Sequence, residues 1–303
     1  MTLAVAASAA AVDLAAMQAG VLDWYAGNAR DLAFRRTIDP WSVLVSEVIA
    51  QQTQASRAAA AWSRFIAEFP TPAALAEVSP ATVIRAWRGL GYNRRAVALR
   101  KAAIAIVEDH RGRVPNTLDE LMRLPGVGPY TARAVLAIAF DHPVAALDTN
   151  IRRVVGRAFL GDEAPLTPRA FQTAADGFVP AGHAATWTHA LMDVGAAFCR
   201  KRDPRCDACP LAGDCRFLAA GRPSTAARAA KRAKPFRSTT RWLRGRVLDR
   251  LRDAADGSWI SFDAPLGEHS LEALVDELAR MQVDALLEMR YQHEGAEARL
   301  ATA

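Results

Sequence analysis

Hydrophobic positions recur at helical spacing along most of the chain. The clearest runs are Val43–Ile49, Ala96–Val107, Thr131–Phe140 and Ala190–Ala197, and a three-to-four-residue repeat predicts helices with one buried face. Prolines fall between these runs, where a helix has to stop. Alternation of polar and apolar residues, the mark of strands, is scarce before residue 240. The pattern therefore predicts a compact all-α domain up to about residue 220.

The last 60 residues have a different pattern. Arg241–Ala254 and Ser270–Met281 are predicted to be helices, the second with four apolar residues on one face. Leu286–Arg290 and Ala296–Leu300 are predicted to pair as a hairpin around Gly295. Helix, helix and hairpin in this order predict a small winged-helix-like module.

Charge is unevenly distributed over residues 221–303. Of the 303 residues, 51% are hydrophobic, and the formal net charge is +6. Residues 221–250 hold ten Lys or Arg and one acid, whereas residues 251–303 hold four basic and eleven acidic residues. The basic segment can neutralise phosphates, although a solvated linker explains it equally well. Such contacts would add affinity without reading sequence.

The chain lacks the features of a membrane or secreted protein. No apolar run is long enough to span a bilayer. The alanine-rich N-terminus has no basic segment before it and is interrupted by Asp13, unlike a signal peptide. The four cysteines are confined to residues 199–215, unlike a disulfide framework. We therefore expect a cytoplasmic protein.

The cysteines have the spacing of a metal site, Cys199-x6-Cys206-x2-Cys209-x5-Cys215. Four thiolates so close together suit a structural zinc ion or a [4Fe–4S] cluster. Only the middle pair has the short spacing of a zinc knuckle, and the residues alone leave the two metals equally supported. Basic residues in the same loop, Arg200 to Arg205, suit phosphate contact.

A second motif, Leu-Pro-Gly-Val-Gly-Pro-Tyr-Thr-Ala, occupies residues 124–132. Pro125 ends one predicted helix, and a second begins near Tyr130. Gly126 and Gly128 permit a tight turn and leave no Cβ in the way of a close approach. Free backbone N–H groups at the start of the second helix suit a phosphate oxygen, although an isolated turn of this kind is more often only structural.

Two carboxylates stand in apolar surroundings. Glu47 lies within the apolar helix Val43–Ile49, where burial raises the pKa of a carboxyl and suits it to act as a general acid. A structural ion pair is the alternative. Asp148 follows an apolar stretch, where an aspartate can cap a helix, act in catalysis, or do both.

These motifs resemble one family of enzymes. The cysteine spacing resembles the cluster loop of the endonuclease III and MutY-type DNA glycosylases, and residues 124–132 resemble their helix-hairpin-helix motif. The string Ser-Glu-Val-Ile-Ala-Gln-Gln-Thr-Gln at 46–54 resembles the MutY-type segment that carries the catalytic glutamate. The resemblance covers roughly residues 20–220. It implies an all-α helix-hairpin-helix glycosylase fold and selects a [4Fe–4S] cluster held by the four cysteines.

The resemblance also implies roles for individual residues. Glu47 would protonate N7 of an extruded adenine, and Asp148 would stabilise the cationic sugar. Tyr130 would help to orient these groups, and it stands where bifunctional relatives carry a lysine nucleophile. The remaining implied site residues are Asn150, which orients these groups; Arg35 and Asp193, which contact the flipped base; Gln52, Thr53, Leu90 and Tyr92, which contact the opposite base; and Gly126 and Gly128.

The implied protein is a monomeric, monofunctional glycosylase that removes adenine opposite 8-oxoguanine or guanine in double-stranded DNA. The expected domains are 1–221 (glycosylase; six-helix barrel about 36–147, iron–sulfur subdomain from the N-terminal helix and about 148–221), 222–240 (basic linker) and 241–303 (C-terminal module).

Three departures keep alternatives open. Phe34 and Ala50 replace residues usual near the base pocket, and the residues after the linker are too few, and have the wrong pattern, for us to expect the Nudix-like domain of the family. A glycosylase of altered base specificity therefore remains an alternative. A non-catalytic iron–sulfur DNA-binding protein is a second alternative, against which the presence of both Glu47 and Asp148 argues.

Overall fold

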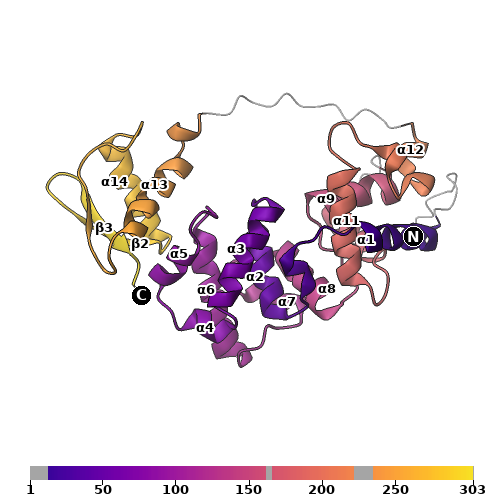
Figure 1. Ribbon diagram of the computed structural model, residues 1–303, viewed down its shortest axis with the longest axis horizontal. Helices are drawn as coiled ribbons and strands as arrows, with labels where there is room; N and C mark the ends of the chain where they lie inside the picture. The colour runs from indigo at the N-terminus through magenta and orange to yellow at the C-terminus, as the bar shows by residue number, and fades with distance from the viewer. Residues whose placement is uncertain (1–12, 162–165, 222–234, 303) are drawn as a thin grey trace. The chain divides into compact units, whose positions relative to one another are not determined.

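The computed structural model describes residues 13–161, 166–221 and 235–302. The chain forms two compact units (Figure 1). The first combines residues 1–31 with 130–226, and the second combines residues 32–129 with 227–303, each in its described parts. Most of the expected basic linker, residues 222–234, lies outside the described residues.

Helices dominate the described chain, as the hydrophobic pattern predicted. They are α1 (Leu14–Asn28), α2 (Pro40–Ala50), α3 (Ala55–Glu68), α4 (Pro72–Ala76), α5 (Pro80–Ala86), α6 (Arg94–His110), α7 (Leu118–Arg123), α8 (Pro129–Phe140), α9 (Thr149–Val154), α10 (Pro168–Asp176), α11 (Ala184–Ala197), α12 (Arg216–Ala219), α13 (Thr240–Asp253) and α14 (Leu271–Val283). The four strongest predicted helices fall within α2, α6, α8 and α11.

Sequence signals at the helix starts explain these boundaries. Helices α2, α4, α5 and α10 each begin with a proline directly after a capping residue. At α2 the carboxylate of Asp39 accepts a hydrogen bond from the backbone N–H of Ser42 at 2.8 Å. Proline lacks an N–H that the first turn would leave unpaired, so the pair begins a helix at little cost.

The core of the first unit is formed by α1, α9 and α11. Trp187 on α11 is 2% exposed and packs edge-on against Phe159, with ring centroids 6.0 Å apart. Phe159 belongs to Val155–Leu160, a π-helical turn that directly continues α9. The ring of Phe159 also stacks on Phe178 at 4.9 Å. These aromatic contacts fix α9, which carries Asp148 at its start.

Helix α2 is buried within the second unit, where α3 and α6 pack against it. Every residue of α2 from Trp41 to Ile49 is buried. The indole nitrogen of Trp41 donates to the carbonyl of Phe69 at 3.1 Å, and that of Trp62 on α3 donates to the carbonyl of Ser42 at 2.9 Å. A helix buried on all sides holds its polar side chains in fixed surroundings.

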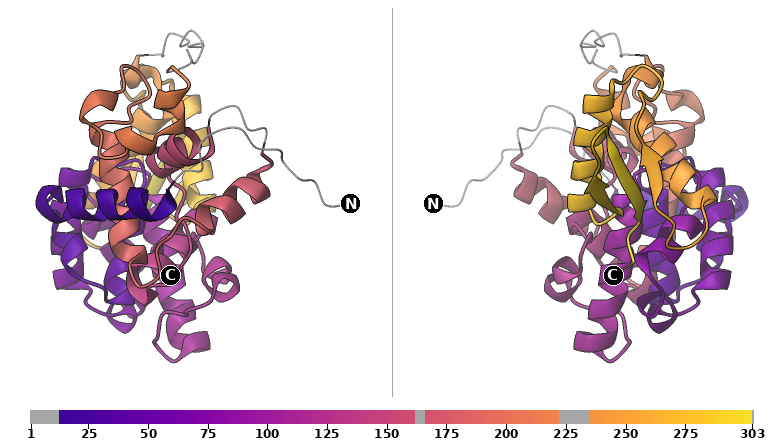
Figure 2. Two further views of the ribbon diagram at one scale, coloured as in Figure 1. Left: turned by 90° about the vertical axis from the view of Figure 1, so that its right-hand side faces the viewer. Right: turned by 90° about the vertical axis from the view of Figure 1, so that its left-hand side faces the viewer.

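The C-terminal module has the predicted helix, helix and hairpin, with one additional strand. Strands β1 (Ile260–Phe262), β2 (Leu287–Tyr291) and β3 (Ala296–Leu300) form an antiparallel sheet in the order β1–β3–β2, seen in the right-hand view of Figure 2. Strand β1 spans only three residues, too few for alternation to be recognised in the sequence.

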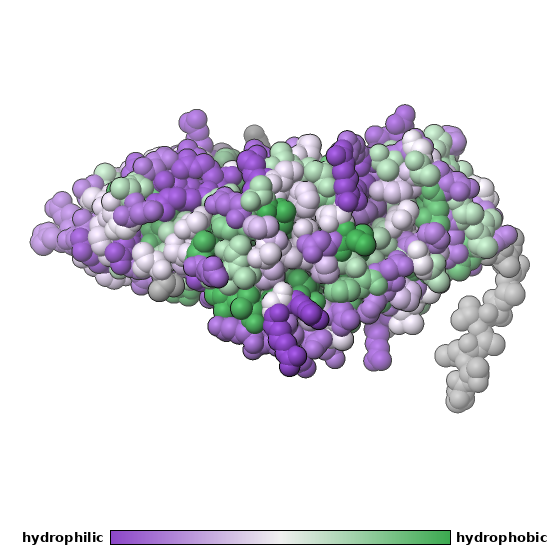
Figure 3. All heavy atoms as spheres, turned by 60° about the horizontal axis from the view of Figure 1, so that its bottom comes forward, coloured by the Kyte–Doolittle hydropathy of each residue, from purple (hydrophilic) through white to green (hydrophobic). Residues whose placement is uncertain are grey.

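Within the described residues, no helix is long and apolar enough to cross a membrane. On the face that Figure 3 presents, hydrophobic residues form separate patches among hydrophilic ones. Scattered apolar residues of this kind are usual on protein surfaces.

Candidate active site and nucleic-acid interface

Glu47 is a buried acid in the second unit. It lies in the last turn of α2, is 7% exposed, and has Val43, Leu44 and Val48 as buried neighbours on the same helix. A carboxyl group kept in such surroundings costs free energy that a solvent-exposed position would avoid. The structure thus agrees with the buried position expected for Glu47.

The end of α2 is fixed by a single arginine of α6. Nη1 of Arg95 donates to the carbonyls of Val48, Ile49 and Gln51 at 2.7, 3.1 and 2.7 Å. These are carbonyls that the end of a helix leaves unpaired. Burial lowers the pKa of Arg95 to about 10, so it remains charged at neutral pH. No motif in the sequence distinguished Arg95 from other arginines.

The same arginine fixes the loop that was expected to face the opposite base. Nη2 of Arg95 donates to the carbonyls of Leu90 and Gly91, each at 3.2 Å. Tyr92 adopts a φ of 45° and is 39% exposed. Left-handed backbone is unusual for an aromatic residue and often marks a functional position.

Gln52 and Thr53 lie in the turn after α2, next to the Arg95 contacts. Gln52 is exposed and has a φ of 54°. The backbone N–H of Thr53 donates to the carbonyl of Ala50 at 3.1 Å. Gln52 also lines a groove with Leu90 and Tyr92, so the structure brings these three predicted residues to one surface.

The two glycines of the hairpin differ in their surroundings. Gly126 has a φ of 79°, and a Cβ there would lie 2.8 Å from the Cβ of Ala98. Gly126 is thus required by both backbone conformation and packing. A Cβ on Gly128 would meet no described atom within 4 Å, so this side of the turn is accessible. The turn connects α7 to α8, as predicted.

Asp148 in the first unit caps α9, as its position suggested. One carboxylate oxygen accepts from the backbone N–H of Ile151 at 2.6 Å, and the other accepts from the side-chain amide of Asn150 at 3.0 Å. Arg153 in turn donates to Asn150 Oδ1 at 2.8 Å and to the carbonyl oxygens of Gly195 and Cys199. Hydrogen bonds thus connect Asp148 to the backbone at the first cysteine.

The approach of α11 to α9 depends on Gly195. A Cβ at this position would lie 2.6 Å from Asn150 Cβ. The absence of a side chain therefore allows Asn150 to sit where it reaches Asp148. Neither Gly195 nor Arg153 carried a signal in the sequence that singled it out.

Asp193, expected to contact the flipped base, is buried and paired. Its carboxylate is 3% exposed and binds Arg30, with Arg30 Nε 2.6 Å from Asp193 Oδ1. The backbone N–H of Arg30 donates to the other oxygen at 3.3 Å. Arg30 is thus a further residue of this site that sequence reasoning missed, because 163 residues separate the pair.

Two further predicted residues, Tyr130 and Arg35, lie near the starts of α8 and α2. Tyr130 is the second residue of α8 and is partly buried. Arg35 lies in a short 3₁₀ turn, Ala33–Arg36, ahead of α2. Phe34 in this turn packs edge-on against Trp62, with centroids 6.4 Å apart.

The four cysteines line one cavity of about 20 Å³ in the first unit, together with apolar side chains that include Phe198, Leu211 and Phe217. Burial and the neighbouring thiols raise the pKa of Cys209 to about 11. Arg157 is 5% exposed, and its Nη1 donates to Cys199 Sγ at 3.9 Å.

All four cysteine side chains border this one cavity. Among the described residues, no three His, Cys, Asp or Glu side chains are arranged to hold a single metal ion.

Each unit holds part of the predicted site. The second unit contains Arg35, Glu47, Gln52, Thr53, Leu90, Tyr92, Gly126 and Gly128; the first contains Tyr130, Asp148, Asn150, Asp193, Cys199, Cys206, Cys209 and Cys215. Each unit therefore carries one of the two predicted catalytic carboxylates, together with groups that hold that carboxylate's helix in place.

One superfamily of DNA repair proteins matches this chain. Residues 45–180 match the HhH-GPD superfamily base excision DNA repair proteins. A thermostable thymine-DNA glycosylase is similar in structure, with a TM-score of 0.63 and 27% identity over 68% of this chain and 98% of that one. An endonuclease III–DNA covalent intermediate has a TM-score of 0.58 and 24% identity over 68% of this chain and 95% of that one, which supports the fold.

The curated relatives are more specific. The adenine DNA glycosylase of Mycolicibacterium smegmatis is 41% identical, with 87% of this chain and 92% of that protein aligned. That of Mycobacterium tuberculosis is 40% identical over 87% and 90%. The chain belongs to the adenine DNA glycosylase family. Because these alignments cover 87% of the chain, they extend into the C-terminal module.

Proposed function

We propose that this protein is a monofunctional DNA glycosylase that removes adenine paired with 8-oxoguanine or guanine. The observation that carries the proposal is Glu47, a buried acid on the apolar helix α2. Its segment resembles the MutY-type sequence, and relatives 40–41% identical over most of the chain are adenine DNA glycosylases. Placing an acid among apolar side chains costs free energy, and perturbed acids of this kind are typical of functional sites.

The chemistry follows from the two carboxyl groups. Glu47 protonates N7 of the extruded adenine, which makes the base a better leaving group, and then accepts a proton from the attacking water. Asp148 stabilises the positive charge that develops on the sugar. Both require the base to leave the stack. Asn150 holds the carboxylate of Asp148 in one orientation through its 3.0 Å hydrogen bond, and Asp193 and Arg35 contact the flipped base.

Strand cleavage is not expected. Tyr130 stands at the position where bifunctional relatives have a lysine, and a phenol cannot form a Schiff base with the sugar. The product is therefore an intact strand with an abasic site.

The four cysteines hold a [4Fe–4S] cluster in this proposal. Four thiols around one apolar cavity, with Arg157 donating to one of them, are a suitable donor set. When bound, the cluster supplies cross-links that hold the loop 199–215 in one shape. The exposed Arg200, Lys201 and Arg202 of that loop then face DNA phosphates from a rigid support.

The proposal includes double-stranded DNA as partner, a monomeric state and a cytoplasmic location. Gly126 and Gly128 in the hairpin would approach a phosphate, and Gln52, Thr53, Leu90 and Tyr92 would face the opposite base. The domain boundaries at residues 221 and 240 remain predictions.

A second candidate is a glycosylase of different base preference. Phe34 and Ala50 depart from the usual residues, and a thymine/uracil-DNA glycosylase of Methanothermobacter thermautotrophicus is 29% identical over 65% of this chain. Single-turnover assays on duplexes with A opposite 8-oxoguanine, A opposite G, T opposite G and thymine glycol separate the candidates. Excision of A alone supports the proposal, excision of T or thymine glycol supports the second candidate, and no excision from any duplex indicates a non-catalytic protein.

A further inference from the structure

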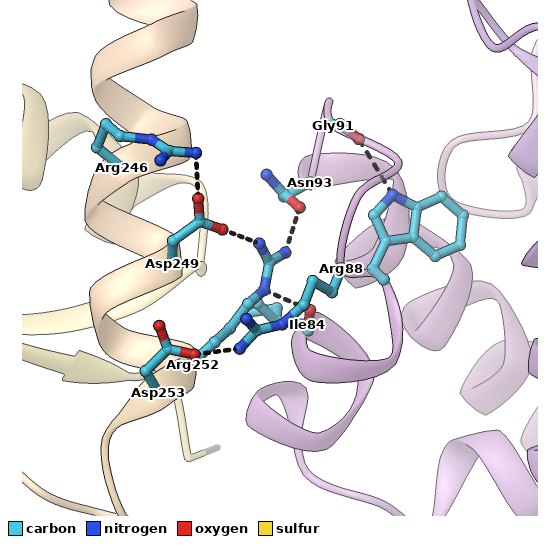
Figure 4. Close-up of polar contacts among 9 residues, drawn as sticks. Ile84, Arg88, Gly91, Asn93, Arg246, Asp249, Arg252 and Asp253 are labelled. Atoms are coloured by element: carbon cyan, nitrogen blue, oxygen red, sulfur yellow. Dashed lines mark hydrogen bonds and ion pairs between the residues drawn. The ribbon is translucent and has the colours of Figure 1, made fainter.

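The C-terminal module is anchored on the α5–α6 segment by a buried arginine. Arg252 on α13 donates to the carbonyl of Ile84 at 3.0 Å and to Asn93 Oδ1 at 2.6 Å (Figure 4). Its side chain is 4% exposed. An ion pair between Arg88 of the α5–α6 segment and Asp253 of α13, at 2.7 Å, adds to these hydrogen bonds (Figure 4). A buried arginine hydrogen-bonded in this way fixes the position of α13 beside residues 89–95.

Apolar packing and the backbone reinforce this anchor. Ala81, Ile84 and Val97 belong to the same buried cluster as the core of the module. The backbone N–H of Ala81 donates to the carbonyl of Ala301 at 3.0 Å. The module and the α5–α6 segment therefore share one core. We do not expect α13 to move independently of the loop formed by residues 89–95.

A groove runs between α13 and the loop. Its volume is about 680 Å³, within the range of about 300–1,000 Å³ typical of ligand sites. It is lined by Gln51, Gln52, Arg57, residues 89–95, Phe236, Thr240, Arg241, Arg244, Gly245, Arg246, Asp249 and Arg252. This lining includes seven arginines and a single acid, Asp249.

Three of these arginines have structural partners. Arg95 and Arg252 bind backbone carbonyls, as described above, and Arg244 pairs with Glu277 at 3.2 Å and with Asp284. They stabilise the walls of the groove.

The other four are exposed. Among the described residues, Arg57 and Arg241 have no ion pair with a carboxylate, while Arg94 is 3.6 Å from Asp284 and Arg246 pairs with Asp249. Arg57 lies on α3 and Arg241 on α13, so both sides of the groove carry a positive charge available to a ligand.

Tyr92 connects the groove to the surface expected to face the opposite base. The guanidinium of Arg241 lies 4.5 Å from the centroid of the Tyr92 ring, and its Nη1 donates to Tyr92 Oη at 3.2 Å. The guanidinium of Arg95 is 5.7 Å from the same ring. The ring is therefore held by a cation from the loop's own helix and a cation from the C-terminal module.

We propose that this groove binds the sugar–phosphate backbone of a DNA strand, with Arg57 and Arg241 contacting phosphates from its two walls. The inference rests on the proposed function, and it adds a DNA-binding surface supplied by the C-terminal module. Exposed arginines around a concave surface suit phosphate oxygens, which they bind with two hydrogen bonds. The volume suits part of one strand, not a whole duplex. Exposed Tyr92 and Phe236 at the same groove offer apolar faces to bases.

The proposal revises the expectation that this basic segment adds affinity alone. Because Arg241 touches Tyr92, a strand bound in the groove also fixes the ring that faces the opposite base. We therefore expect Arg241 to influence the choice between 8-oxoguanine and guanine as well as affinity.

The test measures duplex binding by the full-length, cluster-loaded protein as a function of salt concentration. Removing one arginine that neutralises a phosphate makes the slope of log K against log [salt] less negative by about 0.9. We expect this change for Arg241→Ala and for Arg57→Ala separately, and about twice the change for the double variant. Arg241→Lys retains the charge and should retain most of the slope.

Arg290→Ala is the matched control. Arg290 is an exposed arginine on β2 of the same module, paired with Glu297 and outside the groove. Its removal changes net charge equally but should leave the slope unchanged. Equal effects of Arg290→Ala and Arg241→Ala would mean that only net charge matters, and would overturn the proposal. So would unchanged slopes in Arg57→Ala and Arg241→Ala variants of normal thermal stability, which would favour another partner such as an acidic protein segment.

A second readout separates this inference from the proposed function. The single-turnover rate ratio for A opposite 8-oxoguanine and A opposite G should fall at least twofold in Arg241→Ala and remain at the wild-type value in Arg290→Ala. If the wild type excises no base, the proposed function fails, while the salt slopes still decide whether the groove binds DNA. If excision is normal but neither slope nor ratio changes, the groove proposal alone fails.

Discussion

The side-chain amide of Asn150 donates a hydrogen bond to one carboxylate oxygen of Asp148 at 3.0 Å, while the other oxygen caps α9. Both oxygens are thus held, and Asp148 is at once a structural cap and the proposed catalytic group. Substitutions can separate these two functions because asparagine caps a helix about as well as aspartate does.

Asp148→Asn should abolish excision and preserve the fold. We expect a loss of at least ~10²-fold in the single-turnover rate, with thermal stability near that of the wild type. Asp148→Ala should lose excision activity to the same extent. It should also lose about 1 kcal/mol of stability, because the helix cap is removed. A rate in Asp148→Asn within tenfold of the wild type would contradict a catalytic role.

Glu47→Gln should remove the general acid without changing the shape of the side chain. The expected loss of excision rate is again at least ~10²-fold. Binding to the mismatched duplex should change little, because Glu47 is buried in α2 and is not expected to contact phosphates. Fluorescence anisotropy and single-turnover kinetics on the same samples test both statements. A wild-type excision rate would exclude the role of Glu47.

The wild-type protein should leave an intact abasic strand. Tyr130 provides no amine, so no Schiff base forms. Borohydride treatment during the reaction should therefore trap little enzyme–DNA adduct, and strand breaks should appear only after alkali treatment. Trapping as efficient as with a bifunctional glycosylase would show that another amine acts as nucleophile.

The hairpin glycines should respond differently to alanine. Gly126→Ala places a Cβ 2.8 Å from Ala98 Cβ at a φ of 79°, and we expect the free energy of unfolding to fall by about 1–3 kcal/mol. Gly128→Ala meets no described atom within 4 Å, so its stability should change by less than about 0.5 kcal/mol. If the turn approaches a phosphate, Gly128→Ala should nevertheless weaken duplex binding. Urea denaturation and anisotropy distinguish these effects.

Protein purified without oxidants should be yellow-brown and contain iron and inorganic sulfide, because four thiols surround one cavity. Cys206→Ser should lose the visible absorbance. Metal analysis that finds one zinc ion per chain and no sulfide would overturn the cluster.

Much of this architecture was predicted from local signals in the sequence. The three-to-four-residue apolar repeat, the prolines and the capping residues predicted α2, α6, α8 and α11, because these signals act over a few residues. The order of elements in the C-terminal module was predicted for the same reason. The cysteine spacing and the strings at 46–54 and 124–132 identified candidate residues because local sequence alone places their members close together. The three-residue strand β1 was missed because so short a segment shows no alternation.

Interactions between distant residues had no such signal. The pairing of Asp193 with Arg30, the five carbonyls bound by Arg95, and the contact of Arg241 with Tyr92 join residues that are far apart or carry no distinctive motif. The sequence by itself determined the helices and the family, and it named the candidate site residues. Only the tertiary structure decided which of these residues hold one another and that the C-terminal module borders the Tyr92 loop, because long-range packing depends on the whole chain and not on any local pattern.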